Sequence, residues 1–397
     1  MKDSWKKTLY LVWFVQILSL MSFSFGLPFL PYYIQDLGVT DPEKLRLFTG
    51  ILSAAPAIGM AIMAPIWGMV ADRFGKKPML MRAMISASVI LTGLGLVNSI
   101  TGVLIFRAAQ GFLTGTITAA SALIAAETPQ KNMAYALGFL TSASFIGRTV
   151  GPAVGGVLAE QFGYKPSFFM GGALMLICFF LVLFFVKEHK NPHVEHTGKG
   201  MKNILSILTI PIIIMLALVF FVRIGRSVAS PYMPLYVQEI RGTIEGSALI
   251  TGLIAAGASI MSALSAVFLT RLGDRHNKIK LIMIYLVMGL IVTIPLILTK
   301  TLAGFAVFYA LLFFTLGAID PLIMSETVNL VPENKRGLLF GIRATIGSLA
   351  WAASPMLGSV MSINFSLHSV FYLIPIFLAV TLGFTILFKR QSVKSGI

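Results

Sequence analysis

Cysteine and acidic side chains are scarce in this chain, and each shortage excludes a class of protein. Among 397 residues there is one cysteine, Cys178, so the chain forms neither an internal disulfide nor a cysteine metal site. Asp and Glu together number 15, and charged residues make up only 12% of the chain. A soluble globular domain carries roughly twice that charged fraction. The composition therefore excludes an ordinary soluble protein.

Two signals of chemistry are also missing. No G-x-x-x-x-G-K-[ST] loop occurs, so we expect that the chain does not use ATP directly. Every histidine is predicted in a loop or at a helix end, which disfavours a catalytic set inside a bilayer; these are His189, His193, His196, His276 and His368. We therefore expect no enzyme activity and no bound cofactor or metal.

Apolar residues are what the chain has in abundance. They make up 57% of the sequence and gather in long runs. An α-helix needs about 20 such residues to cross a membrane, whereas outer-membrane barrels show short alternating segments. We predict an all-α integral membrane protein with twelve transmembrane helices, at residues 8–34, 46–70, 79–98, 101–126, 133–158, 166–187, 204–230, 246–270, 280–299, 302–326, 337–361 and 368–388.

The net charge of +16 follows from where the basic residues lie. Most are in alternate loops and in the two tails, and the opposite loops hold only Lys44, Arg46, Lys165, Arg241 and Lys300. Basic residues concentrate on the cytoplasmic side of membrane proteins. We therefore expect a multi-pass protein of the cell membrane, surrounded by lipid, with both termini cytoplasmic and no nucleic-acid partner.

The two halves of the sequence repeat one another. Residues 26–36 return as 229–239, with proline, tyrosine and glutamine at matching positions. We predict an N-terminal six-helix bundle at 1–187, a cytoplasmic linker at 188–202 and a C-terminal six-helix bundle at 203–397. Because six spans is an even number, the second half enters the membrane from the same side, as a parallel repeat about an axis along the membrane normal. This arrangement favours an alternating-access carrier over a channel or a membrane enzyme.

A densely basic loop between the second and third spans, residues 67–82, reads W-G-M-V-A-D-R-F-G-K-K-P-M-L-M-R. Gly68 is expected to let two helices approach, and Asp72 can accept hydrogen bonds at the first turn of a neighbouring helix. The pattern G-x-x-x-D-R-x-G-K-K resembles the signature loop of the major facilitator superfamily. That resemblance implies that Asp72 locks the bundles on the cytoplasmic side, within a gating loop made of Gly68, Asp72, Arg73, Gly75, Lys76, Lys77 and Arg82.

Two further motifs strengthen the resemblance. Arg107 lies in R-A-A-Q-G-F-L-T-G of the fourth span, and residues 147–156 of the fifth read G-R-T-V-G-P-A-V-G-G. Glycines four residues apart share one helix face and permit close helix packing, and an internal proline kinks a helix; these residues are Gly147, Gly151, Pro152 and Gly155. In drug/proton antiporters of the superfamily, this Gly-Pro motif marks exporters and the arginine is linked to proton coupling. The whole chain is similar to bacterial twelve-helix multidrug efflux proteins.

The sequence departs from those antiporters at two places. The first span carries no acid in residues 19–28, where the family often has one, so a coupling acid has to lie elsewhere. In the second half, residues 271–278 keep Asp274 and Arg275 but lack the second glycine of the loop.

Ionisable side chains inside spans are functional candidates because each costs about 3 kcal/mol at a helix centre. The acids are Asp320, deep in the tenth span, and Glu127 and Glu326 near helix ends. Asp320 is our preferred site of proton coupling, with Glu326 and Glu127 as reserves, because burial disfavours its charged form and a nearby arginine restores it. The alternative is a purely structural pair between Asp320 and an arginine.

Five arginines in the spans leave positive charge over, and Arg223 and Arg226 share a helix face because they are three residues apart. Guanidinium groups bind carboxylates bidentately, which suits an anionic or zwitterionic substrate. The alternative is that water, backbone carbonyls or lipid phosphates satisfy them. The predicted substrate cavity contains Arg148, Arg223, Arg226 and Arg343.

The sequence thus favours a monomeric, proton-coupled exporter of small amphipathic compounds. An exporter of an anionic metabolite, such as a carboxylate siderophore, is the main alternative. A nutrient importer on the same scaffold is the other.

Overall fold

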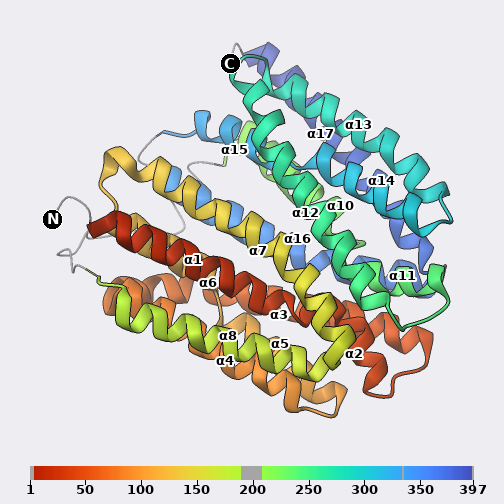
Figure 1. Cartoon of the computed structure of the whole chain (residues 1–397). Coiled ribbons are helices and arrows are strands. Elements are labelled where there is room, and N and C mark those ends of the chain that lie inside the picture. The colour runs from red at the N-terminus through yellow and green to blue at the C-terminus, as the bar shows by residue number, and fades with distance from the viewer. Residues whose placement is uncertain (1–3, 189–207, 333–334, 396–397) are drawn as a thin grey trace. The chain divides into compact units, whose positions relative to one another are not determined.

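The computed structural model describes residues 4–188, 208–332 and 335–395, and every regular element in these ranges is helical (Figure 1). The first half contains α1 Ser4–Ser24, α2 Leu30–Asp36, α3 Pro42–Phe74, α4 Lys76–Leu96, α5 Ile100–Leu113, α6 Thr116–Glu127, α7 Met133–Phe162 and α8 Tyr164–Phe185. The second half contains α10 Ile210–Ser227, α11 Met233–Arg241, α12 Ser247–Arg271, α13 Lys278–Leu298, α14 Leu302–Leu316, α15 Ile319–Asn329, α16 Arg336–Asn364 and α17 Leu373–Ser395.

Each predicted span corresponds to one of these helices or to two consecutive ones. By length and composition, eleven segments of the described residues can cross a membrane. The predicted fifth span lies in α7, which has 30 residues but is less apolar because it contains Arg148 and many Gly, Ser and Thr residues. The prediction of an all-helical membrane fold is confirmed. Most of the predicted linker, including His189, His193 and His196, lies outside the described residues.

The chain forms two compact units. One is Met1–His193 with Val237–Ala256, and the other is Val194–Tyr236 with Gly257–Ile397. The predicted division into halves does not anticipate that residues 237–256 belong with the first unit. One reason is a reciprocal pair of amides at repeat-equivalent positions, in which Gln35 donates to Gln238 at 2.9 Å and Gln238 donates back at 3.0 Å.

The internal repeat is visible in the packing inside each unit. Helix α1 packs against α7 and α8, and its equivalent α10 packs against α16 and α17 (Figure 1). Likewise α4 packs against α8, and α13 packs against α17. The fourth span is broken at residues 114–115 and the tenth at the equivalent residues 317–318. The predicted repeat therefore extends from the sequence to the contacts and to the breaks in the helices.

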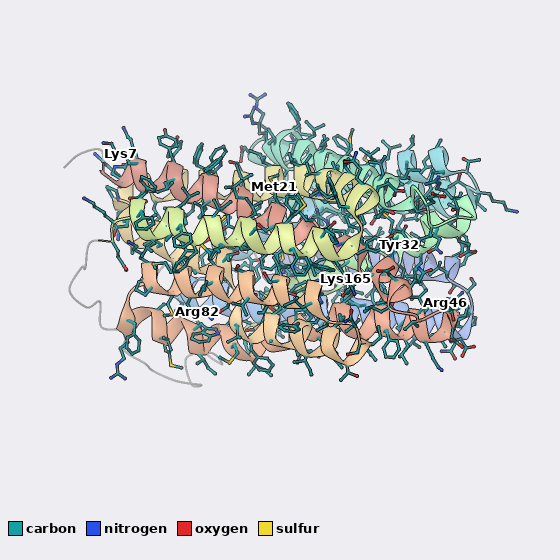
Figure 2. All side chains as sticks on the ribbon, turned by 60° about the horizontal axis from the view of Figure 1, so that its bottom comes forward. Lys7, Met21, Tyr32, Arg46, Arg82 and Lys165 are labelled. Atoms are coloured by element: carbon teal, nitrogen blue, oxygen red, sulfur yellow. The ribbon has the colours of Figure 1, made fainter. Side chains whose placement is uncertain are left out.

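The helices of the first unit run between two ends that differ in the residues they carry. Figure 2 shows Lys7 and Arg82 towards one end and Tyr32 and Arg46 towards the other. This order agrees with the alternate threading predicted from the sequence, in which Lys7 and Arg46 belong to opposite sides.

Cys178 is a packing residue, as expected. Its side chain is fully buried in an apolar cluster with Val12, Met84, Leu123 and Val182. Large apolar side chains are nevertheless exposed on many helices, for example Phe184, Leu298 and Phe365. Such exposed apolar surface is what a lipid environment requires.

Candidate functional site

Asp320 lies in the first turn of α15, directly after the break in the tenth span. Two arginines from other helices converge on its carboxylate. Arg343 of α16 donates from Nη2 to Oδ1 at 2.6 Å and to the Asp320 carbonyl at 3.3 Å, while Arg223 Nη2 of α10 lies 3.6 Å from Oδ2. An acid is tolerated there because the positive end of the helix dipole and two guanidinium groups offset its desolvation. The pairing of Asp320 with an arginine, one of the two alternatives, is therefore present.

Gly347, which the sequence analysis missed, makes room for this cluster. It lies one helical turn after Arg343 on α16, and a Cβ at this position would collide with Nη1 of Arg223. The guanidinium of Arg223 therefore rests against the bare backbone of α16. A glycine four residues after an in-span arginine was the available signal, but only the fold shows which side chain fills the space.

Arg226 has different neighbours from Arg223, although the two share a helix face. Its Nη2 donates to Ser262 Oγ at 2.5 Å, and its guanidinium lies 5.2 Å from the ring centroid of Phe313. Glu326 is half-buried, six residues beyond Asp320 on α15. The structure thus brings Arg223, Arg343 and Asp320 together and places Arg226 one turn away.

The predicted gating loop is held by an acid that the sequence analysis assigned to the linker. Gly75 has φ +104° between α3 and α4, a value that favours glycine. The Glu188 carboxylate accepts from the backbone N–H of Lys76 at 2.6 Å and of Lys77 at 3.0 Å. It therefore satisfies two of the free donors at the start of α4. Lys77 Nζ also donates to the Leu183 carbonyl at 2.9 Å.

Arg82 contacts the broken fourth span. Its Nη1 donates to the Leu113 carbonyl at 2.6 Å, and its guanidinium lies 3.6 Å from the ring centroid of Trp67. Trp67 Nε1 donates to the Phe112 carbonyl at 2.6 Å. Carbonyls at the end of α5 have no partner within the helix, and a cation there is favourable. Trp67 and Arg82 together therefore stabilise the break at residues 114–115.

The remaining loop residues are less informative. Among the described residues nothing lies within 4 Å of a Cβ built at Gly68, so the expected close approach of two helices is not present at this exposed position. Arg73 is exposed and lies over the ring of Phe74 at 5.4 Å. The side chain of Asp72 lies outside the described part of the structure.

Arg107 is buried, and its contacts are with uncharged acceptors. Its Nε donates to the Leu52 carbonyl at 2.8 Å, and its Nη1 donates to Gln110 Oε1 at 2.6 Å. These bonds join α5 to α3 ahead of the break. Glu127 is half-buried at the end of α6, and Arg148 is exposed on α7. The structure therefore does not bring Arg107 into the cluster around Asp320.

The small-residue face of α7 packs against α1, as predicted. A Cβ would lie 2.7 Å from Leu20 Cβ at Gly147, 2.6 Å from Ser24 Cβ at Gly151 and 2.5 Å from the Ser24 carbonyl at Gly155. Only glycine permits so close a contact between the two helices. Pro152 lies inside α7, and Pro355 occupies the equivalent place in α16.

Two repeated halves built from membrane-spanning helices, with an ion-paired cluster inside them, define a multi-pass membrane carrier. The chain belongs to the Major Facilitator Superfamily, whose family model matches residues 12–248 and 215–396. The resemblance inferred from the sequence motifs is thereby confirmed.

Relatives over the full length agree with this assignment. The multidrug resistance protein MdtG of Proteus mirabilis (strain HI4320) is 31% identical over 399 residues, covering 99% of this chain and 97% of the relative. MdtG of Escherichia coli (strain SMS-3-5 / SECEC) is 30% identical over 370 residues, covering 93% and 91%.

Solved structures show the same fold. An inward-facing, unoccupied bacterial homologue of the human lysosomal transporter Spinster matches with a TM-score of 0.81 at 16% identity, covering 99% of this chain and 98% of that one. A mutant of the nucleoside transporter NupG matches with a TM-score of 0.80 at 10% identity, covering 96% and 99%.

Proposed function

We propose that this chain exports small amphipathic compounds by alternating access, in exchange for protons. The name of the MdtG relatives supports the multidrug character. The observation that carries proton coupling is the double pairing of Asp320, which ties α15 to both α10 and α16. A proton on Asp320 removes the charge that holds the two arginines, so it favours a different arrangement of these helices. A substrate that prefers the ionised cluster then alternates with the proton.

The direct test uses inverted membrane vesicles that contain the protein. When respiration acidifies their interior, they are expected to accumulate the fluorescent amphipathic dye ethidium, because protons leaving the lumen drive the dye inward. A protonophore should release the dye. Vesicles without the protein are the control, and equal accumulation in both kinds of vesicle would contradict the proposal.

We also propose that the loop of Gly68, Asp72, Arg73, Gly75, Lys76, Lys77 and Arg82 gates the cytoplasmic side. The support is the attachment of this loop to two other helices, through Glu188 at the end of the sixth span and through Arg82 at the break in the fourth. A loop fixed at both points can transmit a helix movement to the gate.

Asp72→Asn is expected to leave the protein inserted but to slow transport and to shift its balance of inward-open and outward-open states. The reason is that the variant lacks the charge proposed to lock the bundles. Spin-label distances across the cytoplasmic ends, together with dye transport, measure this. Asp41→Asn is the matched control, because Asp41 caps the other end of α3 and asparagine caps equally well. Transport and distances that match the wild type would remove the gating role.

The other sequence predictions remain part of the proposal. Both termini are cytoplasmic, the protein is a monomer in the inner membrane, and Arg107, Glu127 and Glu326 assist proton coupling. An exporter of an anionic metabolite is the second candidate, favoured by the surplus of guanidinium groups around Asp320 within the proposed cavity of Arg148, Arg223, Arg226 and Arg343.

A further inference from the structure

The cluster around Asp320 has hydrogen-bond donors that its one carboxylate does not use. The 3.6 Å separation between Arg223 Nη2 and Asp320 Oδ2 is longer than a hydrogen bond, and the Arg223 side chain is 39% exposed. Arg343 Nε is buried and has no hydrogen-bond acceptor among the described residues. The two guanidinium groups can therefore bind more anionic oxygen atoms than Asp320 supplies.

The charge balance points the same way. With Asp320 ionised, the three groups carry a net charge of one positive unit, and with Asp320 protonated they carry two. Buried charge without a partner is costly, so the protonated cluster has a strong electrostatic demand for an anion. Gly347 lets Arg223 lie against α16, so both guanidinium groups approach one point from α10 and α16.

We propose that Arg223 and Arg343 form a binding site for a small organic carboxylate, a site that Asp320 occupies when ionised and vacates when protonated. Asp320 is in this sense a tethered substitute for the ligand. An anionic ligand and a proton then bind cooperatively, because each favours the state in which Asp320 has released the arginines. The inference rests on the proposal that Asp320 is the proton site.

The other charged groups near the cluster do not replace Asp320 in this role. Arg226 lies one turn from Arg223 on α10 and adds positive charge, while Glu326 is six residues along α15. Of the other helices packed on α15, α14 carries no charged residue and α13 carries only Lys278 and Lys280, in its first turn. Asp320 is thus the acid best placed to compete with a bound carboxylate.

The proposal has a consequence for the direction of coupling. A compound that avoids the arginines exchanges for the proton, as proposed above. A carboxylate that binds with the proton moves in the same direction as the proton. The same cluster would therefore couple protons in opposite senses to cations and to anions.

The test is isothermal titration of the purified full-length protein with benzoate and with sulfate, neither of which titrates between pH 5.5 and pH 8. Titrations in two buffers of different ionisation enthalpy count the protons taken up on binding. We expect uptake of up to one proton per anion, and affinity for benzoate that rises about tenfold per unit fall in pH wherever Asp320 is ionised in the free protein. Benzamide, which has the same shape but no charge, should bind without proton uptake.

Three variants give the proposal its controls. Asp320→Asn should bind benzoate more tightly at pH 8 than the wild type does, with no proton uptake and no dependence on pH. Arg223→Gln and Arg343→Gln should each weaken benzoate binding at least about tenfold, the loss expected for a charge-assisted bond. Thermal unfolding of each purified variant checks that it is folded.

Two results would overturn the inference: no binding of either anion to the wild type at pH 5.5, or pH-independent binding that Asp320→Asn leaves unchanged. Because these titrations need no gradient and no transport, their outcome is separate from the dye assay. Loss of the linkage with intact dye export would remove this inference alone, and the converse would remove the export proposal alone.

Discussion

Asp320→Asn is expected to abolish uphill, pH-driven export while some downhill movement of substrate remains. Asparagine keeps the size of the side chain and an oxygen that can accept from Arg343 Nη2, which donates at 2.6 Å in the wild type. It neither binds a proton nor holds a charge, so the arginines are released permanently. Dye accumulation in acidified inverted vesicles should fall to the level of vesicles without the protein. Preloaded dye should still leave vesicles down its own gradient.

Matched acid-to-amide variants make this result specific. Glu245→Gln changes an exposed residue and should accumulate dye like the wild type. Glu326→Gln and Glu127→Gln test the two reserve acids in the same assay. Full accumulation by Asp320→Asn would exclude Asp320 as the coupling site, and loss of accumulation in Glu326→Gln alone would move the role to Glu326.

Gly155→Leu is expected to disrupt the packing of α7 against α1. A Cβ at Gly155 would lie 2.5 Å from the Ser24 carbonyl oxygen and 2.7 Å from Phe25 Cα. Both are backbone atoms, which cannot move aside as a flexible side chain can. Overpacking of this kind costs about 1–3 kcal/mol or more, enough to lower the thermal midpoint clearly. Thermal unfolding in detergent and the yield of monodisperse protein measure the effect.

Gly138→Leu is the matched control on the same helix. Among the described residues nothing lies within 4 Å of a Cβ at Gly138, and the position is exposed. A leucine there should leave the thermal midpoint nearly unchanged, because it faces open space or lipid. Equal midpoints for the two leucine variants would contradict the close contact between α7 and α1.

The sequence was sufficient for features that depend on one helix at a time. The length of the apolar runs set the spans, because a helix that crosses a membrane must satisfy its own backbone hydrogen bonds. The spacing of Gly147, Gly151 and Gly155 set their common face, and α1 packs on that face in the structure. The repeat of residues 26–36 at 229–239 likewise reappeared as equivalent helices with equivalent breaks.

Spacing was less informative about where long side chains end. Arg223 and Arg226 share a helix face, yet one reaches Asp320 and the other reaches Ser262 and Phe313. A guanidinium group lies several bonds from its backbone, so its partner depends on which neighbouring helix leaves space. That space at Gly347 comes from α16, more than a hundred residues away in the chain.

The sequence alone therefore determined the membrane class, the repeat, the apolar face of each helix and the short set of candidate ionisable residues, since these follow from local composition and helical periodicity. Only the tertiary structure decided which candidates meet. It placed Asp320 between Arg343 and Arg223, kept Arg107 apart from them, and brought Glu188 to the start of α4. Such contacts join residues far apart in the chain, and their energies depend on distance and burial, which become defined only when the helices pack.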